Sequence, residues 1–88
     1  MRTYKDMVYD ILRHTIASYT IYRNKELAEL SKKEPTKMME LSQKVSEQLK
    51  TLNTLEADYR KFDKEEKMEI LEQYVEAVKT LVTKYFED

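Results

Sequence analysis

Residues 38–62, MMELSQKVSEQLKTLNTLEADYRKF, carry the pattern that decides the fold. Side chains at alternating steps of three and four residues make a heptad seam, the spacing of helices packed in a coiled coil. The seam consists of Met38, Leu41, Val45, Gln48, Leu52, Leu55, Tyr59 and Phe62. Gln48 is its polar member and can fix the register of packed helices, unless the helix rotates so that Leu49 packs in its place. We predict a helix over about residues 37–62.

A second helical pattern precedes this seam and extends over about residues 3–30. Its positions at helical spacing are Tyr4, Met7, Val8, Ile11, Leu12, Thr15, Tyr19 and Tyr22. Tyr9, Ile16 and Leu27 widen this face to roughly half of the circumference, whereas a simple surface helix shows a stripe of about 100°. We therefore expect this helix to contact more than one neighbour.

The connection between these two helices is predicted at residues 31–36. Ser31 and Glu34 have the spacing of a capping box, and Pro35 suits the first turn of a helix. The alternative is that Pro35 kinks one continuous helix.

A third helix is predicted over about residues 64–86. Asp63 can cap its start, with Glu66 at the capping-box position. Its apolar positions are Met68, Leu71, Tyr74, Val75, Val78, Leu81, Val82 and Tyr85.

The composition of the 88 residues favours helices over strands, because the chain has no glycine and a single proline. We predict an all-α fold in one domain, residues 1–88, most simply an antiparallel three-helix bundle with long helices and coiled-coil-like seams. A chain this short buries only about 60% of the surface of its unfolded state. The same seams also suit a homodimer, so the sequence is compatible with a core closed by one chain or by two.

The charge distribution limits which classes of partner the chain is expected to bind. Residues 1–34 carry seven Lys/Arg and five Asp/Glu, whereas residues 63–88 carry four and eight, so the charge changes from +2 to −4 along the chain. No segment concentrates the positive charge that phosphate binding needs, which argues against nucleic acid. The chain has no cysteine, no apolar run of signal-peptide length and none long enough for a membrane span. We expect a cytoplasmic protein that does not bind membranes.

His14 is the only histidine, so it is the first residue to consider as a phosphoacceptor, a metal ligand or a catalytic base. As a phosphoacceptor it would resemble histidine phosphotransfer domains, but their usual Lys and Gly at the third and fourth following positions are Ala17 and Ser18 here. With Asp10 it makes one metal-binding pair without the further ligands a site needs. As a base for Ser18 it lacks an orienting carboxylate and an oxyanion hole. A histidine at the edge of the core or at an interface is the simpler interpretation.

These observations favour a small non-enzymatic protein that binds another protein, as an adaptor, inhibitor or assembly subunit. We expect no catalytic residue, no cofactor and no metal. The predicted partner-binding residues lie on the first helix: Tyr9, Ile16, Ile21 and Leu27. The alternative hypothesis is that the chain is a self-assembling coiled coil and that its extra apolar face is its own dimer interface. Phosphotransfer through His14 is a third hypothesis.

Overall fold

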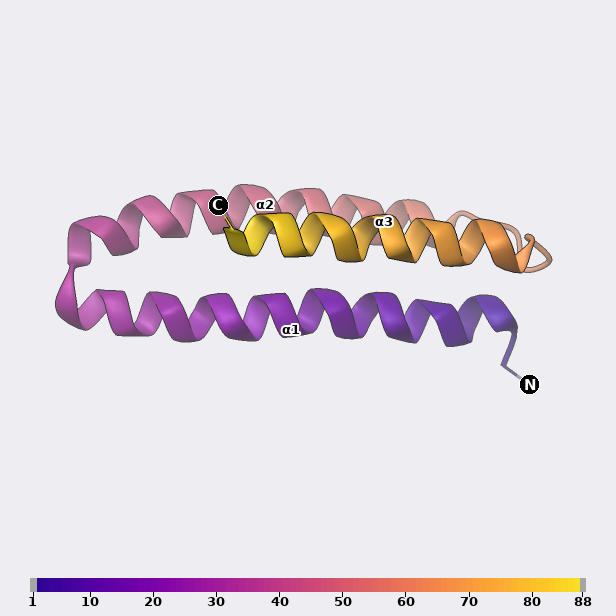
Figure 1. The fold of residues 1–88 in the computed structure, drawn as a ribbon, viewed down its shortest axis with the longest axis horizontal. Coiled ribbons are helices and arrows are strands. Elements are labelled where there is room, and N and C mark those ends of the chain that lie inside the picture. The colour runs from indigo at the N-terminus through magenta and orange to yellow at the C-terminus, as the bar shows by residue number, and fades with distance from the viewer. Residues whose placement is uncertain (1, 88) are drawn as a thin grey trace.

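The computed structural model describes residues 2–87, in which the helices are α1 (Tyr4–Lys33), α2 (Pro35–Arg60) and α3 (Met68–Glu87). Successive helices run in opposite directions along the long axis (Figure 1). The molecule measures 49 × 21 × 18 Å. The prediction of an all-helical chain with three packed helices is confirmed.

The reversal between α1 and α2 is shorter than predicted and occupies Glu34 alone. Ser31 does not cap α2, because it lies inside α1 and its hydroxyl donates to the carbonyl of Ala28 at 2.7 Å. α1 continues past the predicted end to Lys33. Pro35 is the first residue of α2, as expected, and the chain turns there instead of kinking.

The start of α3 also differs from the prediction. The carboxylate of Asp63 accepts the backbone N–H of Glu65 at 3.1 Å, so it stabilises a turn within the connection. The first α3 hydrogen bonds go to the carbonyl of Lys67, which accepts the N–H of Leu71 at 3.2 Å. Asp63 therefore does not cap α3, which begins at Met68.

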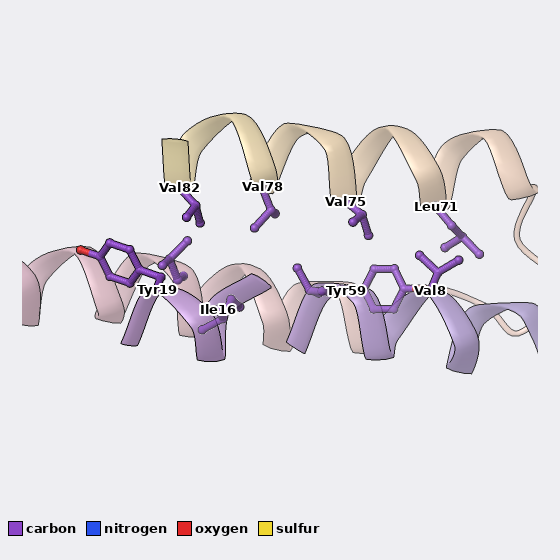
Figure 2. Packing of buried hydrophobic residues seen from close by; sticks show 10 residues of the cluster. Val8, Ile16, Tyr19, Tyr59, Leu71, Val75, Val78 and Val82 are labelled. Carbon is purple, nitrogen blue, oxygen red and sulfur yellow. The ribbon is translucent and has the colours of Figure 1, made fainter. Parts of the chain in front are cut away.

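The core lies along the axis between the three helices. Figure 2 shows four α3 side chains, Leu71, Val75, Val78 and Val82, pointing toward residues of the other two helices. The α1 and α2 members of this cluster are Val8, Leu12, Ile16, Tyr19, Leu52 and Tyr59. α1 contacts both other helices, and α3 packs more closely on α1 than on α2. The expectation that the first helix has more than one neighbour is therefore correct.

Gln48 is buried in the seam, where it faces α1. The hydroxyl of the fully buried Tyr19 donates to its Oε1 atom. Leu49 is only partly buried, so the helix has not rotated to put Leu49 in its place. A satisfied polar pair of this kind favours one register of α1 against α2, because any shift leaves both groups unpaired in an apolar core.

Arg23, a residue of α1, stabilises the last turn of α3. Its side chain is only 3% exposed, and its Nη2 atom donates to the backbone carbonyl of Tyr85. Its Nη1 atom donates to Glu26 at 2.7 Å, and its guanidinium lies 5.7 Å from the centre of the Phe86 ring. A cation at a helix C-terminus is favourable, because the last carbonyls carry partial negative charge.

Among residues 2–87, only α1 and α2 extend from Arg23 toward the turn at Glu34. We call residues 24–44 the hairpin tip. In Figure 1 the described part of α3 lies beside the hairpin away from the turn that joins α1 to α2. Within residues 2–87 the tip therefore consists of α1 and α2.

Replacing Arg23 with alanine should lower the free energy of unfolding by about 2 kcal/mol, because it removes charged hydrogen bonds to Tyr85 and Glu26. Urea unfolding measures this loss, and hydrogen exchange should show faster exchange in the last turn of α3. The matched control is Arg13→Ala on the exposed surface, which should change stability by less than about 0.5 kcal/mol. Equal effects of the two substitutions would contradict the role given to Arg23.

Stability should also fall in alkali because of Tyr59. Burial raises the pKa of Tyr59 from 10.0 to about 12. The unfolded chain therefore loses this phenol proton first, so the stabilisation is complete below pH 10 and is lost as the pH rises toward 12.

Urea unfolding at stepped pH values tests this. Tyr59→Phe should flatten the decline between these pH values, although it also removes the 2.8 Å hydrogen bond to the Lys5 carbonyl and so lowers stability at neutral pH. Tyr22→Phe, at a half-exposed position, should leave the decline unchanged. A decline that persists unaltered in Tyr59→Phe would show that other groups cause it.

Candidate interaction surface

Large apolar side chains stand exposed on the side of α1 that the core does not use. Met7, Ile11, Ile21 and Tyr22 are each between 46% and 58% exposed. His14 and Ser18 lie between them on the same side and are also exposed. Their positions follow helical steps of three and four, which align them along one strip of the helix. We call these six residues the outer face of α1.

A groove between α1 and α3 borders this face. It encloses about 220 Å³, which is below the roughly 300 Å³ of a typical small-molecule site. Its lining residues are Tyr4, Val8, Ile11, Glu72, Val75, Glu76 and Lys79. A shallow groove with apolar walls suits the side chains of a docked protein segment better than an enclosed ligand.

The α3 edge of this groove is acidic. Glu72 accepts a hydrogen bond from the hydroxyl of Tyr4, and this bond raises the pKa of Tyr4. Glu76 pairs with Lys79, whose Nζ lies 3.4 Å from its carboxylate. Glu69 stands one turn before Glu72, so α3 presents three carboxylates and one ammonium along this edge.

The structure does not bring the four predicted partner-binding residues together on one surface. Ile16 is 6% exposed and belongs to the core. Tyr9 is partly buried: its hydroxyl donates to Glu56 at 2.5 Å, which raises its pKa, and its ring stacks on a core tyrosine. Leu27 is partly buried in the hairpin tip, and Ile21 is the one member exposed on the outer face.

Met7, Ile11 and Tyr22 were expected on the core face of α1, yet they lie outside the core. The buried positions of α1 are Val8, Leu12, Ile16, Tyr19 and Arg23. Two separate stripes at helical spacing explain the half-circumference of apolar side chains: one packs inside, and the other stays exposed. Tracing each stripe separately would have grouped Met7 with Ile11, but the sequence pattern does not say which of the two stripes is buried.

His14 lies exposed beside Asp10, Arg13 and Ala17, which line a shallow hollow with it. The carboxylate of Asp10 is already paired with Arg2. Within residues 2–87, His, Asp and Glu side chains form no group of three that could hold a metal ion. The structure therefore gives His14 no assembled site among the described residues.

Comparison of the chain with protein-family models, curated proteins and solved structures gives no match. Among residues 2–87, none of the helices combines the length and apolar character needed to cross a bilayer.

The two isoleucines of α1 should respond in opposite ways to a charge. Ile16→Glu puts a carboxylate into the core and should lower the free energy of unfolding by about 3 kcal/mol or more. Ile21→Glu places it in solvent and should change stability by less than about 0.5 kcal/mol. Thermal unfolding followed by circular dichroism measures both. A large loss in Ile21→Glu would show that this side chain packs inside the molecule.

Proposed function

We propose that this chain is a small non-enzymatic protein-binding module that docks a segment of another protein along the outer face of α1. The observation that carries this proposal is the alignment of Met7, Ile11, Ile21 and Tyr22, all about half exposed. Single exposed apolar side chains are ordinary on a protein surface, but an aligned set bordered by polar groups is typical of an interaction site.

The shape of this surface supports a helical partner. An amphipathic helix fits a groove between two helices through side chains spaced three, four and seven residues apart. Ile11 lies both in the groove and on the outer face, which makes it the natural centre of such a contact. Glu72 and Glu76 on the α3 edge favour a partner with lysine or arginine beside its apolar stripe.

Self-assembly through the same face is the second candidate. Met7, Ile11, His14, Ser18 and Ile21 follow steps of four and three, which is the heptad spacing that two copies of α1 would need. His14 and Ser18 at its centre are weak seam residues compared with leucine or isoleucine. The first candidate is therefore preferred.

Photo-crosslinking from a single position tests the proposal. Benzoylphenylalanine replaces Ile11 in one variant and Thr54, exposed on the far side of α2, in the control. After irradiation in an extract of the cells that produce the protein, the Ile11 variant should give a discrete heavier adduct and the Thr54 variant none.

Adding Ile21→Glu to the Ile11 variant should reduce the adduct at least tenfold, since a buried apolar contact of an interface contributes more than about 1.4 kcal/mol. An adduct of twice the 10.7 kDa chain mass would instead support self-assembly through this face. Equal labelling from both positions, or none from Ile11, would contradict the proposal.

A further inference from the structure

The surface where α1 and α3 meet has a direction, because the two helices run parallel. Figure 1 shows both of them starting at the same end of the molecule, while α2 runs the opposite way. Tyr4 donates to Glu72 near that end, and the rings of Tyr22 and Phe86 lie 4.9 Å apart farther along. We call this surface, from Tyr4 to Tyr22, the α1–α3 border. It extends along α1 for about 27 Å.

Negative charge is concentrated in the first half of this border. Glu72 and Glu76 line the groove there, and both residues are exposed. Lys79 pairs with Glu76 and so offsets one of the two charges. The partner of Glu72 is the neutral hydroxyl of Tyr4, so that hydrogen bond leaves the carboxylate charge in place. The first half of the border is therefore acidic.

The second half of the border is formed by uncharged side chains. On α1, Thr15 and Ser18 precede Tyr22 at steps of three and four residues, so they lie on the same side of the helix. On α3, Thr83 stands one turn before Phe86, whose ring contacts that of Tyr22. Hydroxyl and aromatic groups therefore replace the carboxylates of the first half.

The charges next to Tyr22 balance one another. Lys25, Glu26 and Glu29 line a hollow together with Tyr22. Glu26 also pairs with Arg23, whose Nη1 atom lies 2.7 Å from its carboxylate. Two cations and two carboxylates thus meet at this end. The border therefore has a negative end near the start of α1 and a neutral end near Tyr22.

The dipoles of the two helices favour one direction for a third helix docked on the border. Both α1 and α3 have the positive ends of their dipoles at the acidic end of the border. The C-terminus of a docked helix fits there, because its last carbonyls carry partial negative charge. Lysine and arginine are favourable in the last turns of a helix. One direction therefore aligns the dipoles and also brings basic side chains to Glu72 and Glu76.

α2 provides an example of this direction within the molecule. It is antiparallel to α1 and α3 and packs against both. At the C-terminal end of α2, the ammonium of Lys5 in the first turn of α1 donates to the carbonyls of Arg60, at 2.8 Å, and Phe62. A helix docked on the α1–α3 border would repeat the direction of α2.

We propose that the segment docked on the outer face of α1 is an amphipathic helix antiparallel to α1, with lysine or arginine in its last two turns facing Glu72 and Glu76. Its apolar stripe covers Ile11, and its first turns reach Tyr22. A helix of about 18 residues spans this length at 1.5 Å per residue. The inference rests on the function proposed above and adds the direction of the partner and the position of its basic residues.

Selection from a displayed peptide library tests binding and direction together. The library consists of 18-residue helices with a fixed leucine stripe, and the positions that flank the stripe are randomised between lysine, glutamine and glutamate. Peptides retained by the wild-type chain should carry lysine in their last two turns about five times as often as in their first two, the effect expected of two partly exposed ion pairs. A chain with Ile11→Glu and Ile21→Glu gives the background level.

Two further variants of the chain show whether the carboxylates of the border cause this bias. Glu72→Gln combined with Glu76→Gln should still retain peptides with the leucine stripe, but the bias in lysine position should disappear. The matched control is Glu40→Gln combined with Glu47→Gln, which removes two exposed carboxylates of α2. This control should select the same peptides as the wild-type chain.

A nitroxide label on a selected peptide reports its direction in the complex. A label at the peptide C-terminus should broaden the amide resonances of Tyr4 and Met7. A label at the N-terminus should instead broaden those of Ile21 and Tyr22, because the antiparallel helix begins beside them.

The outcomes separate this inference from the function on which it rests. Retention of no peptide above the background level would contradict the proposed function and this inference with it. Retained peptides without a lysine bias, with lysine in the first two turns, or with the reversed labelling pattern would overturn the inference alone. A bias that persists in the chain with Glu72→Gln and Glu76→Gln would do the same.

Discussion

The inner stripe of α1 is the surface on which both other helices depend. α2 and α3 each pack against it, and α3 has closer contact with α1 than with α2. Leu12 and Tyr19 of this stripe are fully buried between the helices. A small domain has little apolar area to lose, so a helix shared by two neighbours must supply much of its stability. The hairpin of α1 and α2 forms one wall, and α3 closes the space above it.

A polar cluster within this core determines how the helices align. Tyr19 donates to Gln48 across the α1–α2 contact, and Arg23 reaches from α1 to the carbonyl of Tyr85 on α3. No nitrogen or oxygen atom of a buried side chain within residues 2–87 lacks a hydrogen-bond partner. Such groups are costly to leave unpaired, so they oppose sliding of the helices, which apolar contacts alone resist only weakly.

The candidate contact surface follows from this packing. Because α2 and α3 use only the inner stripe of α1, Met7, Ile11, Ile21 and Tyr22 are left on the outside. Carboxylates of α3 border this surface.

The sequence by itself determined the class of fold and the inner seam of α2, because the spacings of three, four and seven residues between Val45, Gln48, Leu52 and Tyr59 are those of one face of a helix. It also favoured a reversal near Pro35 over a kinked continuous helix, although α1 extends to Lys33 and the turn occupies Glu34 alone. Only the tertiary structure decided which half of the apolar face of α1 is buried. Ile16 is buried in the core and Ile11 is 46% exposed. The sequence pattern had instead assigned Ile16 to the partner-binding surface and Ile11 to the core face. The reason is that helical periodicity shows which residues share a face, while the position of the neighbouring helices decides which face loses its water.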